Sequence, residues 1–195
     1  MIKVTLVRHG ETEWSLSGRH TGRSDIPLTP RGEANAARLQ GRLADSSPVL
    51  VLSSPLQRAR RTCVLAGFGD RMQIDPDLAE WDYGQYEGRK TADIHKELPD
   101  WSLFRDGCPG GESADDVGRR ADRAIARVRA VDGDAILFAH GHLLRVLAAR
   151  WVALPPQSGA LLLLAPASIS ILSYEHSLTE PAIALWNDNR ASSNL

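Results

Sequence analysis

The sequence has few cysteines and no long apolar run. Cys63 and Cys108 are its only cysteines, and their spacing matches no metal motif, so both are expected to be reduced thiols. The longest apolar run, residues 160–165, is far below the ~20 residues needed to span a bilayer. The first residues enter an apolar strand pattern directly, without the features of a signal peptide. These absences predict a cytoplasmic protein without a membrane segment.

The sequence also has no excess of charge of one sign. The formal net charge is −1, and no block of basic residues occurs, which argues against a nucleic-acid partner. Hydrophobic residues at 43% and charged residues at 24% are ordinary values for a globular chain, so disordered and fibrous classes are excluded. A length of 195 residues favours one domain, residues 1–195, over two.

Short apolar runs alternate with patterns of helical period. Strands are expected at residues 2–7, 49–52, 72–74, 135–138, 168–173 and 182–186. Helices are expected at residues 30–44, 56–66, 91–98, 101–104, 117–128 and 143–153. The alternation predicts an α/β fold, a three-layer α/β/α sandwich with a mostly parallel central sheet whose last two strands close or edge it.

Local signals mark where several of these helices begin. Thr29-Pro30 and Ser54-Pro55 each combine a capping side chain with a proline suited to the first helical turn. Ser113 and Asp116 have the spacing of a capping box. Residues 15–26 are expected to form a polar loop. Residues 75–112, rich in Pro, Gly, Trp and Tyr, are expected to form an active-site lid or insert.

Three strand ends carry matching chemistry. The first expected strand ends at Arg8-His9-Gly10, the second leads into Arg58, and the 135–138 strand ends at His140-Gly141-His142. If these strands are neighbours, two guanidiniums and two imidazoles converge at one edge of the sheet, beside the helix N-termini that follow Ser54 and Gly141. Such a pocket suits a phosphoryl group, and the surrounding cations disfavour imidazolium, leaving a neutral ring nitrogen as a nucleophile.

Five motifs together resemble one family. LVRHGETEW, LTPRG, SSPLQRARRT, EWDYGQYEG and AHGHLLR are similar, in order, to motifs of the histidine phosphatase superfamily, in the branch that contains cofactor-dependent phosphoglycerate mutases and many small phosphatases. The resemblance implies a phosphoglycerate mutase-like fold and phosphorylation of His9 during turnover. It implies a phosphate-binding set of Arg8, Arg58 and His140. It also implies that Glu80 protonates the leaving oxygen, and microscopic reversibility suggests that the same residue then deprotonates the attacking water.

The departures from that pattern favour a phosphatase. Ser15 stands where members often have Asn, and Trp81-Asp82 stands where mutases usually have a basic pair. Residues 100–112 lack the basic, proline-containing substrate motif of the mutases. The chain is more similar to small acid phosphatases and to the sedoheptulose-bisphosphatase-like group.

Further residues are candidates for holding the substrate. The expected substrate contacts are Arg8, Ser15, Thr21, Gly22, Arg58, Arg105, His140, Gly141 and His142. Arg19, Arg23, Lys90 and Arg105 are available around the mouth for a second anionic group, and His20 shares the active-site loop. Trp81, Tyr83 and Tyr86 could shield Glu80 from water.

The sequence therefore predicts a metal-independent phosphatase that hydrolyses phosphomonoesters of small metabolites, sugar phosphates or bisphosphates among them, through a phosphohistidine and without a cofactor. A phosphoglycerate mutase is the first alternative, and a signalling protein phosphatase or phospho-recognition module is the second. The pair His140 and His142 also leaves a metal site open, although no spaced carboxylates accompany it. A homodimer is one assembly that the sequence allows.

Overall fold

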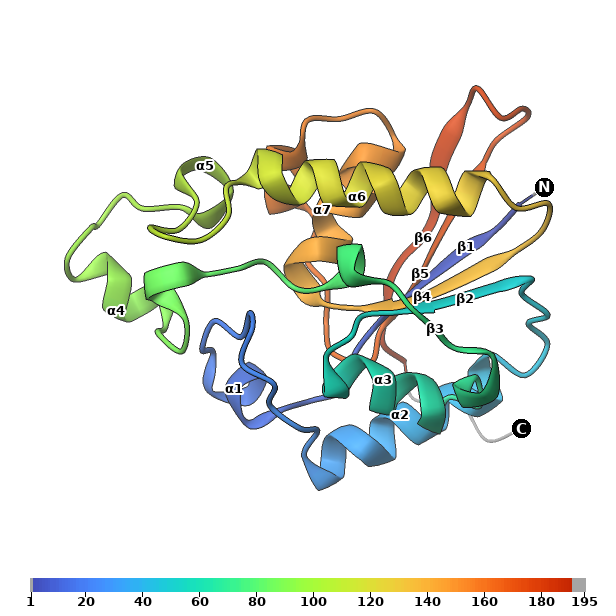
Figure 1. Cartoon of the computed structure of the whole chain (residues 1–195), viewed down its shortest axis with the longest axis horizontal. Coiled ribbons are helices and arrows are strands. Elements are labelled where there is room, and N and C mark those ends of the chain that lie inside the picture. Colours follow the sequence, from blue (N-terminus) through green and yellow to red (C-terminus); the bar gives the residue numbers. More distant parts are fainter. Residues whose placement is uncertain (1, 191–195) are drawn as a thin grey trace.

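A six-stranded sheet in the order β3-β2-β4-β1-β5-β6 organises the chain (Figure 1). The computed structural model describes residues 2–190. The strands are β1 (Val4–Arg8), β2 (Leu50–Ser53), β3 (Gln73–Ile74), β4 (Ala135–Ala139), β5 (Ile169–Tyr174) and β6 (Pro181–Asp188). Strands β1 to β4 pair in parallel: β4 lies between β1 and β2, and β2 also pairs with β3. Strand β5 is antiparallel to β1, and β6 is antiparallel to β5. The mostly parallel sheet is confirmed, and the two late strands lie together at one side of it, with β6 at the edge.

Apolar side chains cover both faces of the central strands. Leu6 of β1 and Leu137 of β4 belong to one buried cluster, while Val7 and Phe138, their neighbours in sequence, belong to the other. This alternation follows from the period of two along a strand. Because both faces are buried, the central strands read as continuous apolar runs rather than alternating ones.

Helices pack on both faces of the sheet, which confirms the three-layer α/β/α sandwich. In Figure 1, α2 (Pro30–Arg42) and α3 (Gln57–Leu65) lie on one side, and α6 (Ala114–Arg129) and α7 (Gly141–Trp151) on the other. Within residues 2–190, no helix is both long and apolar enough to cross a membrane.

The predicted caps of α2 and α6 are confirmed. The Thr29 side chain accepts a hydrogen bond from the Gly32 amide, with Pro30 in the first turn. Ser113 and Asp116 form a reciprocal capping box. The start of α3 differs from the prediction: Leu56 occupies the capping position without a side-chain cap, and Asp25 accepts the Gln57 amide from outside the helix at 2.8 Å.

The region predicted as a loop at residues 15–26 contains the end of a short helix, α1 (Glu13–Ser17). Thr12 and Ser15 form its capping box, and Gly18 ends it in the left-handed region at φ 73°. The prediction failed because Thr12-x-x-Ser15 is a weaker signal than a box that ends in Glu or Gln.

Residues 75–112 contain only short helical elements. These are α4 (Thr91–His95), α5 (Leu103–Asp106) and the 3-10 turns Pro76–Leu78 and Gly84–Tyr86. Figure 1 shows α4 and α5 beyond the same end of the sheet as α1. Two other 3-10 elements, Gly69–Arg71 and Pro156–Leu161, precede β3 and follow α7.

Two motif glycines pack against each other where β1 meets α2. A Cβ at Gly10 would lie 2.5 Å from the Gly32 carbonyl oxygen, and one at Gly32 would lie 2.1 Å from the Glu11 carbonyl oxygen. Real Cβ atoms do not approach backbone this closely, so both positions require glycine. The LTPRG motif therefore holds the backbone that leaves His9.

We predict that Gly32→Ala destabilises the protein, because the methyl group must displace the backbone of residue 11. The expected loss is about 1–3 kcal/mol, as for other overpacked sites. Gly41→Ala in the same helix is the matched control, since nothing lies within 4 Å of its Cβ position. That substitution should leave stability unchanged or raise it by up to about 1 kcal/mol. Urea unfolding of both variants is the measurement, and equal effects would contradict the packing argument.

Candidate active site

A cavity of about 250 Å³ lies where β1 and β4 end. Arg8 and His9 reach it from the end of β1, and Gly141 and His142 from the start of α7 after β4. Glu80, from the irregular segment between β3 and α6, lines the same cavity. Strands β2, β4 and β1 are adjacent and parallel, so the three strand ends singled out in the sequence do meet at one edge.

His9 presents one ring nitrogen as an acceptor. Its Nδ1 lies 2.7 Å from the Gly10 carbonyl oxygen, which can only accept, so Nδ1 carries the proton. Burial, with the guanidiniums of Arg58 and Arg8, holds the pKa of His9 well below its usual value. The ring is therefore neutral, and Nε2 keeps its lone pair.

The tautomer of His140 is fixed in the opposite sense. Arg58 donates its Nε–H to Nδ1 of His140 at 3.1 Å, so the ring proton sits on Nε2, 2.7 Å from the Ser54 hydroxyl. Burial and Arg58 lower the pKa of His140, and its ring centroid lies 5.1 Å from that of His9. Two neutral imidazoles with opposite tautomers thus stand side by side.

Arg8 is the cation that lines the cavity from the strand end. One of its terminal nitrogens donates to the Leu164 carbonyl, and Nε is buried without a hydrogen-bond partner. A Cβ at Gly141 would lie 3.2 Å from the Arg8 guanidinium carbon, so glycine lets this group pack over the start of α7. Burial lowers the pKa of Arg8, and the nearby Glu80 raises it. A buried cation with an unused donor suits an anionic ligand.

Arg58 is placed differently from its predicted role as a phosphate contact. Its guanidinium donates to the carbonyl oxygens of Thr21, Gly22 and Ser24 at 2.8–3.0 Å and to His140, and it is not among the residues lining the cavity. In this structure it holds the loop and the imidazole behind the cavity wall. Its contact with substrate stays a prediction.

Glu80 joins the irregular segment to α7. Its carboxylate accepts the amides of His142 and Leu143 at 3.1 and 2.9 Å, and that of Trp81 at 2.9 Å. The prediction that this helix N-terminus offers free N–H groups is therefore wrong for these two amides. The start of α3 is likewise occupied, since the Ser54 hydroxyl accepts the Leu56 amide. Trp81 and the two tyrosines expected to shield Glu80 are all buried.

Three neutral rings, those of His20, Tyr83 and His142, form another part of the cavity lining. The Tyr83 hydroxyl lies 2.6 Å from Nδ1 of His142, and the His20 ring packs 4.7 Å from that of Tyr83. Burial and the Glu80 charge hold the pKa of Tyr83 well above its usual value, whereas burial lowers the pKa of His142. The tyrosine is therefore the donor, and His142 carries its own proton on Nε2.

The other predicted substrate contacts divide into two groups. Ser15, Thr21 and His142 line the cavity, although the Ser15 hydroxyl also serves the capping of α1. Gly22 does not line it: a Cβ there would lie 2.5 Å from the Trp81 carbonyl oxygen, so glycine serves close packing. Arg105 does not line it either, because its guanidinium is paired with Asp106 at 2.7 Å.

The cations proposed for the mouth are also divided. Arg19 lines the cavity, whereas Lys90 does not. Arg23 also lies off the cavity wall and pairs with Asp82 at 2.7 Å. Sequence reasoning missed Arg145, which lines the cavity and donates to the carbonyls of Gly159 and Ala160. Its position four residues after Gly141 on α7 was the available signal.

Neither thiol nor a metal cluster lies in the cavity. Cys63 and Cys108 are buried, and burial raises the pKa of each to about 12. Across residues 2–190, the one group of three metal-type ligands within 4.8 Å is Glu175, His176 and Glu180, exposed at the β5–β6 turn. The cavity thus offers imidazole, carboxylate and guanidinium groups for chemistry.

A family model for the histidine phosphatase superfamily (branch 1) matches residues 4–189. The chain belongs to this superfamily. Curated members similar to it include an acid phosphatase of Mycobacterium tuberculosis, 40% identical over 93% of this chain and 91% of the relative. Sedoheptulose 1,7-bisphosphatase of Saccharomyces cerevisiae is 39% identical over 80% of this chain and 69% of its own length. A probable phosphoglycerate mutase of Photorhabdus laumondii is 34% identical over 91% and 87%.

Solved members of the superfamily share the fold. A structure from Mycobacterium tuberculosis superposes with a TM-score of 0.90 at 37% identity, covering 97% of this chain and 99% of its own. Mycobacterial glucosyl-3-phosphoglycerate phosphatase gives 0.86 at 28% identity, covering 96% and 100%. A putative α-ribazole-5′-phosphate phosphatase of Escherichia coli gives 0.84 at 26%, covering 99% of each chain.

We predict that the free energy of unfolding falls as the pH drops below about 6.5, the usual pKa of histidine. His9, His20, His140 and His142 all have lowered pKa values in the folded state. The unfolded chain therefore binds more protons than the folded chain in acid, which favours unfolding. Urea unfolding between pH 7.5 and 4.5 measures the slope.

His20→Gln is the matched variant for this prediction. The pKa of His20 is about 4 in the folded state, so its contribution to the slope falls between about pH 6.5 and pH 4. The substitution should flatten the slope there by at most about 1.4 kcal/mol per pH unit, the value for one proton. An unchanged slope would show that His20 is protonated equally in both states.

Proposed function

We propose that the protein is a phosphatase that hydrolyses phosphomonoesters of small metabolites through a phosphohistidine on His9. One observation carries the proposal: the neutral His9 ring, with its Nε2 lone pair, shares a small cavity with the Arg8 cation and the Glu80 carboxyl group. A nucleophile, an electrophilic anchor and an acid-base group are the parts that phosphoryl transfer needs.

In the first half-reaction, Nε2 of His9 attacks phosphorus and forms the N–P bond as the P–O bond to the alcohol breaks. Glu80, in its protonated form, gives a proton to the leaving oxygen, and Arg8 stabilises charge on the phosphoryl oxygens. The hydrogen bond from Nδ1 to the Gly10 carbonyl stabilises the positive charge that the ring acquires. Arg58 and His140 act in this proposal from behind the cavity, by fixing the neighbouring loop and electrostatics.

In the second half-reaction, the Glu80 carboxylate takes a proton from water as the water oxygen attacks phosphorus. The N–P bond breaks, phosphate leaves and His9 returns to the neutral ring. One residue can serve both halves because the second step reverses the proton transfer of the first. No step requires a metal or a cofactor, so activity is expected to survive chelation.

The relatives support a small phosphorylated substrate. The acid phosphatase, the sedoheptulose bisphosphatase and the glucosyl-3-phosphoglycerate phosphatase are named as phosphatases. Arg19 and Arg145, the two further guanidiniums on the cavity wall, are the groups we propose for a second anionic part of the substrate. We further propose a cytoplasmic location, and we keep the homodimer as an expectation for light scattering to measure.

We predict that His9→Ala abolishes turnover, with a loss of at least about 10⁴-fold as for other covalent nucleophiles. His176→Ala, at an exposed position on the β5–β6 turn, is the matched control and should keep wild-type activity. The assay releases phosphate from p-nitrophenyl phosphate and β-glycerophosphate in the presence of EDTA.

Acid-labile phosphorylation, trapped by base quenching, should be present in wild type and absent from His9→Ala. Turnover by His9→Ala near the wild-type rate would contradict the assignment. A phospho-recognition module, in contrast, would bind phosphate esters without releasing phosphate in any variant.

We predict phosphate release rather than mutase activity, since Trp81-Asp82 replaces the basic pair usual in mutases. Incubation with 3-phosphoglycerate and catalytic 2,3-bisphosphoglycerate should give little 2-phosphoglycerate. Rapid interconversion of the two isomers, with no free phosphate formed, would establish the mutase alternative that the Photorhabdus laumondii relative represents.

A further inference from the structure

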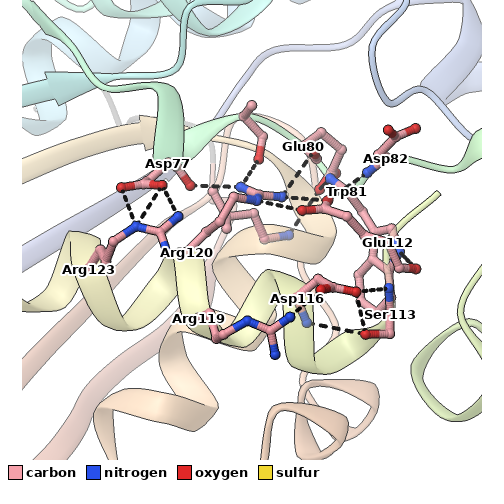
Figure 2. A network of polar contacts seen from close by, with 12 residues as sticks. Asp77, Glu80, Trp81, Asp82, Glu112, Ser113, Asp116, Arg119, Arg120 and Arg123 are labelled. Atoms are coloured by element: carbon pink, nitrogen blue, oxygen red, sulfur yellow. Dashed lines mark hydrogen bonds and ion pairs between the residues drawn. The ribbon is translucent and has the colours of Figure 1, made fainter.

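One arginine on α6 holds the segment that carries Glu80 (Figure 2). The two terminal nitrogens of Arg120 donate to the carbonyl oxygens of Asp77 at 2.8 Å, Ala79 at 2.9 Å and Glu80 at 3.3 Å. Nε and one terminal nitrogen also bind the two Glu112 carboxylate oxygens at 2.7 and 2.8 Å. These five bonds use all five N–H donors of the guanidinium.

Glu112 binds the following two residues of the same segment, Trp81 and Asp82. Its Oε2 accepts the Asp82 amide at 2.9 Å, and its own amide donates to the Asp82 carbonyl at 2.9 Å. Its carbonyl accepts the Trp81 indole N–H at 2.9 Å. Both members of the Arg120–Glu112 pair are largely buried, with side-chain exposures of 14% and 20%. The backbone from residue 77 to residue 82 is therefore held by Arg120 on α6 and by Glu112 just before that helix.

This arrangement bears on Glu80 in particular. The carboxyl group of Glu80 reaches the start of α7 and the cavity, while its carbonyl oxygen is held by Arg120. A side chain on an irregular segment is held less precisely than one on a helix or strand, unless other residues fix its backbone. Arg120 itself does not line the cavity.

We propose that Arg120 is a positioning residue that places the Glu80 carboxyl group for proton transfer to the leaving oxygen. The inference deepens the proposed function and rests on it. Arg120 acts through the backbone of residues 77–80 and touches no reacting atom. A lysine cannot replace it, because an ammonium group has three donors and no planar fork.

The chain offers a matched control on the same face of α6. Arg123 lies one turn further along and pairs with Asp77, but only through the carboxylate, and its side chain is 55% exposed. It makes no hydrogen bond to the Glu80 backbone in the described structure. Arg123→Met should therefore remove an ion pair between α6 and the same segment without moving Glu80.

Two substrates with different leaving groups distinguish a loss of Glu80 positioning from a loss of folded protein. Nitrophenolate leaves without an acid, whereas the alkoxide of β-glycerophosphate needs one. Rapid-quench measurements of His9 phosphorylation with both substrates are made for Glu80→Gln, Arg120→Met, Arg120→Lys, Glu112→Gln and Arg123→Met. Melting temperatures show which variants are folded, and Arg120→Lys and Glu112→Gln carry the test if Arg120→Met does not fold.

The proposal expects Arg120→Met and Arg120→Lys to lose at least about 10-fold more rate with β-glycerophosphate than with p-nitrophenyl phosphate, in the direction of Glu80→Gln. Glu112→Gln should show a smaller loss of the same kind, and Arg123→Met none. Equal losses for both substrates in the Arg120 variants, while Glu80→Gln still discriminates, would overturn the positioning role alone. A Glu80→Gln variant that does not discriminate would overturn the acid role and the positioning role together.

Discussion

The site depends on one contact, the acceptance of two α7 amides by the Glu80 carboxylate. Helix N-termini favour a negative group, and here the group comes from a segment without long helices or strands of its own. The contact joins that segment to the helix that begins directly after His140. Because Arg8 packs over Gly141 at the same helix start, the end of β1 and the carboxyl group of Glu80 both meet α7 at its first turn.

The sheet and the ends of its strands could be predicted from sequence because the signals are local. The apolar run before Arg8 and the buried run before His140 each determine a strand. Adjacency of the strand ends then follows from parallel α/β topology. The interactions of Arg58 could not be predicted this way: its partners at residues 21–24 are more than thirty positions away and are carbonyl oxygens, which every residue has. The bonds of Arg120 to Ala79 and Glu80 could not be predicted for the same reason, because they also join distant residues through backbone carbonyl oxygens.

Motif residues do not all belong to the chemistry. Gly22 and Gly32 lie in motifs or loops of the site, yet each is required because a backbone carbonyl oxygen would be within 2.5 Å of any Cβ. Gly84, in the EWDYG motif, similarly packs against the Pro109 carbonyl, which would lie 2.3 Å from its Cβ. From sequence alone, a packing glycine and a ligand-binding glycine look the same, and the close packing of Gly22 gives this position a structural reason to be glycine.

The guanidiniums of Arg8, Arg58 and Arg120 differ in how far protein acceptors satisfy their donors. Arg58 and Arg120 donate hydrogen bonds to protein acceptors, which offsets the cost of burying their charge. Arg8 differs, because its Nε is the one buried side-chain nitrogen or oxygen in residues 2–190 without a partner. An unpaired donor on a buried cation, whose pKa burial lowers, leaves Arg8 able to bind an anionic group. In residues 2–190, the one buried donor left without a partner thus belongs to a residue of the cavity wall, whereas Arg58 and Arg120 are bonded to protein acceptors.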